Sequence, residues 1–158
     1  MRDSLGAVPM TIENEQPTQI SLPDWAAVWL RYHRERRDAD FWAVDSVFLL
    51  PLDDPERAWL LTLELIRQAD WEELGRIGAG PLEHLVEAHA PEFIDRIESQ
   101  ATIDPKFKEA LATIWVNSRY LPSEIVTRLV SASGDEIEPF DLDYDEAERK
   151  MSGEKDGA

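Results

Sequence analysis

The densest group of histidine and glutamate in the chain is the segment Glu83–His89, which reads EHLVEAH. A metalloprotease helix carries its two histidine ligands four residues apart, on one face. His84 and His89 are five residues apart, so they lie about 140° from each other around a helix. This spacing predicts two histidines at the surface or boundary of a helix, beside carboxylates, and no metal site.

A second candidate for chemistry is the glycine-rich stretch Gly75–Gly80, because glycines before a helix can present backbone N–H groups to a phosphate. Pro81 removes one of these donors, and Glu83 places a negative charge where the phosphate would lie. A tight turn between two helices explains the stretch better. In that turn we expect Gly80 to adopt a conformation that is costly for other residues, and Glu83 to cap the backbone N–H three residues earlier.

Three aspartates near the C-terminus, Asp141, Asp143 and Asp145, alternate like the first ligands of a calcium-binding loop. Such a loop also needs a glycine, where this chain has Glu146, and a bidentate glutamate, where it has Ser152. We therefore expect no specific calcium site.

Among the 33 acidic residues, Glu64 is the best candidate for a catalytic carboxylate. It lies in the most apolar segment, where desolvation would raise its pKa, but Arg57 and Gln68 share its polar stripe and favour an ion pair or solvent. The chain has no serine in a nucleophile elbow. An enzyme or a small-ligand binder with an interhelical pocket around Glu64 or His84 stays open as an alternative.

The composition of the chain limits the classes of protein to which it can belong. The chain has 158 residues, 43% of them hydrophobic, so one domain with a real core is expected. A net charge of -17 disfavours nonspecific binding to nucleic acid or anionic lipid. The absence of cysteine excludes disulfides, iron–sulfur clusters and thiol nucleophiles, and fits a reducing cytoplasm. No apolar run is long enough for a signal peptide or a membrane span, and no cofactor is expected.

Helix start signals followed by a 3.6-residue apolar pattern predict an all-α bundle of about seven short helices, and no segment alternates like a strand. Short connections favour hairpin-like packing. The segment 55–69 is apolar on nearly all sides, so it should be the central helix. The first expected helix begins at Ser21. The other expected helices cover residues 41–50, 55–69, 70–77, 81–89, 91–101, 105–116 and 122–132.

The same patterns divide the chain into a flexible leader (1–20), a helical domain (21–132) and an acidic tail (133–158). The tail holds ten acidic and three basic residues, a net charge of -7, so it should be largely disordered when free. Its apolar residues are interleaved with acids, a pattern that can dock in a groove with a basic rim and an apolar floor. The groove could belong to a partner or to the first helix, and the alternative is a solubilising extension. The expected partner-binding residues are Phe140, Asp141, Asp143, Tyr144 and Asp145, and the arginines of the first helix are Arg31, Arg34, Arg36 and Arg37.

Six tryptophans need burial or a partner. Most should lie in the core, because short helices need bulky side chains to bury enough surface. Tryptophan is also a frequent anchor of protein interfaces, so one or two can lie at the surface. The six are Trp25, Trp29, Trp42, Trp59, Trp71 and Trp115.

A tryptophan-containing, leucine-rich helix around Trp59 is followed by the segment Gly78–Leu85, and further on by Phe93, Ile94 and Trp115. These residues resemble an uncharacterised bacterial all-helical domain family, whose hallmark is such a helix followed by an A-G-P-L-E-x-L turn. The resemblance covers about residues 41–120. It implies a small helical bacterial protein with no established activity, and a packing and capping role for the structural motif Trp59, Gly80, Pro81, Leu82 and Glu83.

Size, charge and the lack of catalytic motifs favour a noncatalytic cytoplasmic protein-interaction domain. Its sharpest form is an immunity or antitoxin-like inhibitor, because an acidic surface steers a basic partner to rapid encounter. Besides the interhelical pocket, a nucleic-acid mimic, in which carboxylates imitate phosphates, stays open. The sequence leaves the oligomeric state undetermined.

Overall fold

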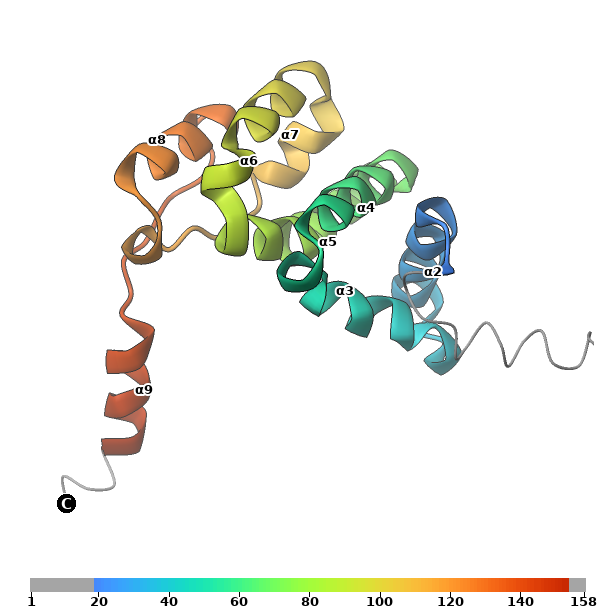
Figure 1. Ribbon diagram of the computed structural model, residues 1–158, viewed down its shortest axis with the longest axis horizontal. Coiled ribbons are helices and arrows are strands. Elements are labelled where there is room, and N and C mark those ends of the chain that lie inside the picture. Colours follow the sequence, from blue (N-terminus) through green and yellow to red (C-terminus); the bar gives the residue numbers. More distant parts are fainter. Residues whose placement is uncertain (1–18, 154–158) are drawn as a thin grey trace, which may run out of the picture.

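The computed structural model describes residues 19–153, and its N-terminal half consists of three mutually packed helices (Figure 1): α2 (Leu22–Glu35), α3 (Phe41–Asp53) and α4 (Pro55–Gln68). Local caps begin two of them. The Ser21 hydroxyl accepts a hydrogen bond from the Asp24 N–H at 3.2 Å, and the Asp54 carboxylate accepts one from the Arg57 N–H at 3.1 Å. Both starts lie where the sequence predicts them, because a cap depends only on neighbouring residues.

The helix α4 lies at the centre of the fold, as its composition predicts. It packs against α2, α3, α5 (Leu74–Ile77), α6 (Glu83–Ile103) and α7 (Pro105–Leu111). Its buried side chains include Trp59, Leu61 and Leu65. Leu60 is exposed, so α4 retains one open apolar position.

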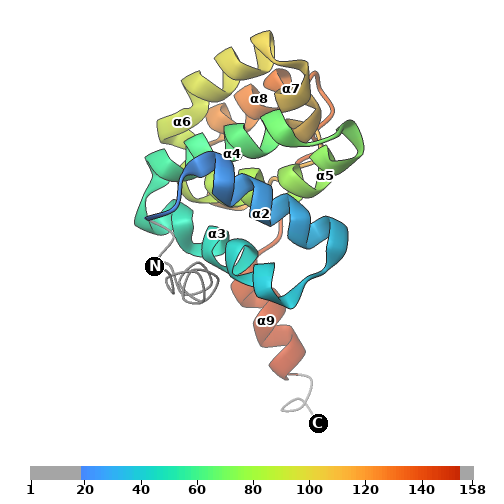
Figure 2. The same cartoon turned by 90° about the vertical axis from the view of Figure 1, so that its right-hand side faces the viewer.

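The second half of the fold is built on α6, which packs against α7 and α8 (Ser123–Ala132), as Figure 2 shows. Three short 3₁₀ turns, Asp38–Asp40, Trp71–Glu73 and Ser118–Tyr120, connect the helices. Within residues 19–153 the backbone forms no strand, only an isolated parallel bridge between Asn117 and Phe140. The all-α class is confirmed. None of the helices in this range is both long and apolar enough to cross a membrane.

Several helix boundaries differ from the predictions at prolines. The first of these helices, α3, does not end at Leu50 but continues through Pro51 to Asp53. From Glu83 onwards, the expected helices 81–89 and 91–101 form one helix, α6, which contains Pro91 and is kinked at His89 (φ -143°, ψ 22°). A proline in a helix loses one backbone hydrogen bond and can kink the helix, yet both α3 and α6 continue past their prolines. For α7, the predicted helix is too long: α7 ends at Leu111 and not at residue 116.

The stretch Gly78–Leu82 is also not the expected tight turn. It forms a π-helical turn that joins α5 to α6 without a break, and the Glu83 N–H donates to the Gly78 carbonyl. Gly80 has a helical backbone, and nothing lies within 4 Å of a Cβ built on it. The glycine that packing requires is Gly78, where a Cβ would lie 2.0 Å from Thr113 Oγ1 and 2.1 Å from the Ala110 carbonyl oxygen. The prediction that Gly80 adopts a conformation costly for other residues is therefore wrong. The close contact between the turn and Ala110 explains why residue 78 is a glycine.

The acidic tail differs most from the sequence prediction. Ile137 is only 3% exposed and belongs to the core, and the Ser133 hydroxyl accepts hydrogen bonds from the N–H groups of Glu136 and Ile137. The chain then runs along the body of the protein, and α9 (Tyr144–Gly153) reaches away from it (Figure 1). For residues 133–153, the expected disorder is thus wrong. Residues 154–158, like residues 1–18 of the expected leader, lie outside the described range.

The tryptophans divide between core and surface. Trp25, Trp29 and Trp59 are buried and Trp42 is half-buried, whereas Trp71 and Trp115 are exposed. The Trp25 indole N–H donates to the Ala43 carbonyl at 3.0 Å and so ties α2 to α3.

Candidate functional site

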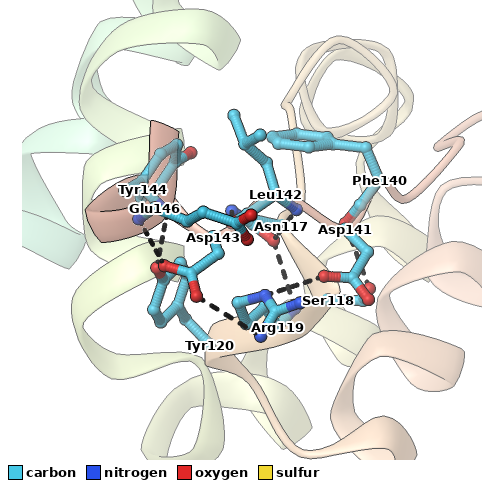
Figure 3. Close-up of polar contacts among 10 residues, drawn as sticks. All are labelled: Asn117, Ser118, Arg119, Tyr120, Phe140, Asp141, Leu142, Asp143, Tyr144 and Glu146. Atoms are coloured by element: carbon cyan, nitrogen blue, oxygen red, sulfur yellow. Dashed lines mark hydrogen bonds and ion pairs between the residues drawn. The ribbon is translucent and has the colours of Figure 1, made fainter. Parts of the chain in front are cut away.

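Four of the five predicted partner-binding residues of the tail lie against the connection between α7 and α8: Phe140, Asp141, Asp143 and Tyr144 (Figure 3). The Phe140 N–H donates to the Val116 carbonyl at 3.0 Å, and the Ser118 N–H donates to the Phe140 carbonyl at 2.7 Å. The Phe140 ring meets the Trp115 ring edge-on, with 6.1 Å between centroids. The tail is thereby attached to the domain through its backbone.

Asn117 strengthens this attachment with its side-chain amide. The amide N–H donates to the Leu142 carbonyl at 2.8 Å, while the amide oxygen accepts from the Leu142 N–H at 3.2 Å and from the Arg119 N–H at 3.1 Å. Asn117 is a buried polar residue, so these bonds replace the water that burial removes.

Two of the predicted aspartates form an ion-pair group with Arg119 (Figure 3). The Arg119 guanidinium lies 2.9 Å from the Asp141 carboxylate and 3.8 Å from the Asp143 carboxylate. Asp143 also begins α9, since its carboxylate accepts from the Glu146 N–H at 3.0 Å. This backbone hydrogen bond, together with Arg119, lowers the pKa of Asp143.

The third feature of the site is an aromatic pair above an apolar recess. Tyr120 and Tyr144 stack with 5.3 Å between centroids, and the Tyr144 N–H donates to the Tyr120 hydroxyl at 2.9 Å. The recess has a volume of about 210 Å³. Its lining residues are Val86, Glu87, Trp115, Val116, Asn117, Tyr120, Leu121 and Tyr144. We call the recess and its exposed aromatic rim, Trp115, Tyr120 and Tyr144, the aromatic site.

Glu83 supports the aromatic site in a role that the sequence did not predict. Its carboxylate accepts a hydrogen bond from the Trp115 N–H at 2.7 Å and does not cap the backbone three residues earlier. Burial raises the pKa of Glu83. Glu83 therefore holds the backbone of Trp115, whose side chain is part of the exposed aromatic rim.

The arginines of the first helix do not hold the tail. The Arg31 guanidinium contacts both carboxylate oxygens of the buried Asp40 at 2.7 Å, and Arg34 binds Glu73 in the same two-pronged way at 2.6 and 2.7 Å. Arg36 lies over the Tyr32 ring, and Arg37 lies 3.7 Å from Asp40. The prediction that the tail docks on the first helix is thus wrong. The tail instead contacts Asn117 and Arg119, in the connection between α7 and α8.

The remaining acidic candidates, Glu64 and Asp145, differ in their surroundings. Glu64 binds Arg67 and accepts from the Gln68 amide at 2.8 Å, and the Arg67 contact lowers its pKa instead of raising it. Asp145 is exposed on α9. No group of three or more histidine, aspartate or glutamate side chains suited to a metal ion occurs in the described part of the chain.

The three histidines differ in their surroundings. His89 Nε2 donates to the Pro51 carbonyl at 2.8 Å and links α6 to α3. His84 packs on Phe48, with 4.4 Å between ring centroids, and burial lowers its pKa. His33 packs on Trp29 at 4.2 Å, and burial followed by the nearby Arg76 lowers its pKa to about 4.

Acidification is expected to weaken the fold through His33. Its pKa is about 4 in the folded state, against 6.5 for a free imidazole, so the unfolded chain binds more protons between these values. The free energy of unfolding should therefore fall with decreasing pH in this window, by up to about 1 kcal/mol per pH unit after allowance for solvent screening. Urea titrations from pH 6.5 downwards would measure this slope.

A His33→Phe variant is the control, because phenylalanine keeps the ring on Trp29 but cannot titrate. Its slope above about pH 5 should be shallower than that of the parent. The lowered pKa of His84 also makes the free energy of unfolding fall with decreasing pH. Arg76 and Arg36 lower the pKa of His33, whereas Glu73 raises it. Equal slopes for the two proteins would contradict the assignment to His33.

Sequence reasoning missed the contribution of the 115–121 connection to the aromatic site. Trp115 is 71% exposed, Tyr120 51% and Tyr144 46%. The only signal available was the possibility that one or two tryptophans lie at the surface. A second exposed apolar surface, also missed, lies on α3 and consists of Phe41, Phe48, Leu49 and Leu52.

Comparison with protein families matches residues 31–136 to a family described as "Family of unknown function (DUF6869)". The match is wider than the expected range of 41–120, since it starts within α2 and reaches the residue before Ile137. Comparisons with curated proteins and with solved structures found no significant match. Because the match covers more than half of the chain, the chain belongs to this domain family of unknown function, DUF6869.

Proposed function

We propose that the protein is a noncatalytic cytoplasmic interaction domain that captures a basic protein partner through the aromatic site, in the manner of a bacterial immunity or antitoxin-like inhibitor. The observation that carries this proposal is the exposure of Trp115, Tyr120 and Tyr144 around an apolar recess. Tryptophan and tyrosine dominate the binding energy of protein interfaces when a partner covers them.

The charge of the protein favours a basic partner. The chain carries a net charge of -17, and the recess is bordered by the carboxylate of Glu87. Asp145 adds a second exposed carboxylate directly after Tyr144. Such a surface attracts lysine and arginine over long distances and accelerates encounter at low salt. An apolar side chain of the partner would fill the recess, while its basic residues would meet the carboxylates.

The noncatalytic part of the proposal is supported by the contacts of Glu64. Its carboxylate is held by Arg67 and Gln68, so it is not free to act as a base. In the aromatic site, the Tyr120 hydroxyl is engaged by the Tyr144 N–H, an arrangement that suits recognition better than bond cleavage.

Affinity capture in the organism that encodes the chain would test this function with three baits. The baits are the full chain, a Trp115→Ala/Tyr144→Ala variant and a Leu52→Ser variant, which alters the exposed surface of α3. We expect the full chain and Leu52→Ser to retain the same basic protein, and the aromatic variant to lose it. The captured protein is then purified, and its dissociation constant should rise at least about tenfold for the aromatic variant and also with added salt.

An inhibitor role adds a separate expectation. The captured protein, expressed alone, should arrest growth, and coexpression of the full chain should restore it. Capture of an acidic partner, or equal affinity of all three baits, would contradict the proposed surface.

A further inference from the structure

A second recess lies among α2, α3 and the π-helical turn, and the proposed interaction function does not use it. Its volume is about 260 Å³. Its walls are largely apolar and include Trp29, Val47 and Phe48, while His33, His84 and Arg76 supply its ionisable groups. An apolar cavity of about 150 Å³ already holds benzene, so this recess, here called the histidine pocket, has room for one ring and a polar group.

Two residues that line the histidine pocket, His33 and His84, each carry a buried imidazole nitrogen that lacks a hydrogen-bond partner. They are His33 Nε2 and His84 Nδ1, and neither has a partner among residues 19–153. A buried polar atom without a partner costs free energy, so such atoms are rare in folded proteins. Two of them around one recess indicate a place where a ligand supplies the missing contacts.

The tautomer of His33 follows from its neighbour. Arg76 Nη1 lies 3.3 Å from His33 Nδ1, and a guanidinium can only donate. His33 Nδ1 is therefore the acceptor, and in the neutral ring the proton lies on Nε2. The unpartnered nitrogen of His33 is thus a hydrogen-bond donor, which needs an acceptor from a ligand.

The charge of the histidine pocket is opposite to that of the whole chain. Arg76 is the single charged residue among those that line the pocket, and it forms no ion pair among the described residues. The Glu73 carboxylate, which interacts electrostatically with Arg76, is held by Arg34 through two hydrogen bonds. A cation without a carboxylate partner, in a chain of net charge -17, favours an anionic ligand.

The π-helical turn contributes open space to the same place. Gly80 lines the pocket, and nothing lies within 4 Å of a Cβ built on it. Because packing does not require this glycine, its lack of a side chain is better explained by the space that it leaves in the pocket. Single π-helical turns inside α-helices occur frequently at functional sites.

We propose that the histidine pocket binds a small organic acid with an aromatic or branched aliphatic body. The ligand's carboxylate accepts from the Arg76 guanidinium and from His33 Nε2–H, and its apolar body lies against Trp29, Val47 and Phe48. His84 Nδ1 is left to meet a second polar group of the ligand.

Titration of the full chain with five defined probes tests this proposal. The probes are phenylacetate, 3-phenylpropionate and 4-methylpentanoate as acids, and benzyl alcohol and benzylamine as bodies without a carboxylate. Calorimetry and histidine ring NMR signals are the readouts. We expect at least one acid to bind and to shift the signals of both His33 and His84, and the alcohol and the amine to bind at least about tenfold more weakly.

Two variants and one control assign the contacts. Arg76→Gln removes the cation, and His33→Phe removes the donor while keeping an aromatic ring on Trp29; each should raise the dissociation constant of the acid at least about tenfold. Arg96→Gln, which removes a cation bound to Glu56 on another face, should leave it unchanged within about twofold. If no acid binds, or if benzylamine binds as well as phenylacetate, the proposal is overturned.

The proposals for the histidine pocket and for the aromatic site can be tested independently of each other. The Trp115→Ala/Tyr144→Ala variant alters none of the residues that line the histidine pocket, so it should retain the affinity of the full chain for the acid. Loss of acid binding in that variant would also count against the assignment.

Discussion

A Gly78→Ala substitution is expected to destabilise the protein by about 3 kcal/mol or more. Gly78 is buried where the π-helical turn crosses the end of α7. The added Cβ would lie 2.0 Å from Thr113 Oγ1 and 2.1 Å from the Ala110 carbonyl oxygen. The second contact is with backbone, so a side-chain rotation cannot relieve it. The two helical segments must move apart, and the hydrogen bond from Thr113 to Ala110 must break or shift.

The matched control is Gly80→Ala, two residues further along the same turn. Nothing lies within 4 Å of its Cβ, and alanine favours helical backbone over glycine. Its free energy of unfolding should be unchanged or higher by up to about 1 kcal/mol. Urea unfolding followed by circular dichroism measures both variants. Equal stability of the two variants would mean that the close approach at Gly78 does not limit packing.

Truncation after Ala132 is expected to cost about 3 to 6 kcal/mol, although the removed segment is acidic and hydrophilic on average. The truncated chain loses the buried Ile137, which contributes about 2 to 3 kcal/mol. It also leaves the Asn117 amide without its two bonds to Leu142, a further cost of about 1 to 3 kcal/mol. Truncation after Asp143, by contrast, keeps all these contacts and removes only α9 and the residues after it, so stability should change by less than about 1 kcal/mol.

Chemical denaturation of the two truncated chains and of the full chain compares these costs. Where the shorter chain does not fold, Ile137→Ala gives the same information, with an expected loss of about 2 kcal/mol or more. Leu142→Ala is its control, because the Leu142 side chain is exposed and only its backbone contacts Asn117. A chain ending at Ala132 that is as stable as the full chain would show that the tail does not belong to the folded domain.

The truncation after Asp143 also separates stability from recognition. It removes Tyr144, one of the three exposed aromatics of the aromatic site, and leaves the core intact. Under the proposed function, this chain should fold normally and still bind the basic partner at least about tenfold more weakly.

The amino-acid sequence by itself determined the all-α class, most helix starts and the central position of α4. Each depends on residues close together in the chain. A cap such as Ser21 or Asp54 bonds to a backbone N–H three residues later, and a helix that carries Trp59 and Leu65 on its apolar face is buried wherever it packs. The large negative charge and the lack of cysteine chemistry also follow from composition alone.

Only the tertiary structure decided which glycine is required, where the tail lies and which tryptophans are exposed. Gly78 and Gly80 lie two residues apart in the same turn, and the contact of Gly78 with Ala110, 32 residues away, distinguishes them. The tail has the composition of a disordered segment, yet Asn117 and Arg119 hold it through bonds to residues 22 to 25 positions away. Local patterns carry no information about such partners, because the free energy of these contacts comes from groups that only the complete fold brings together.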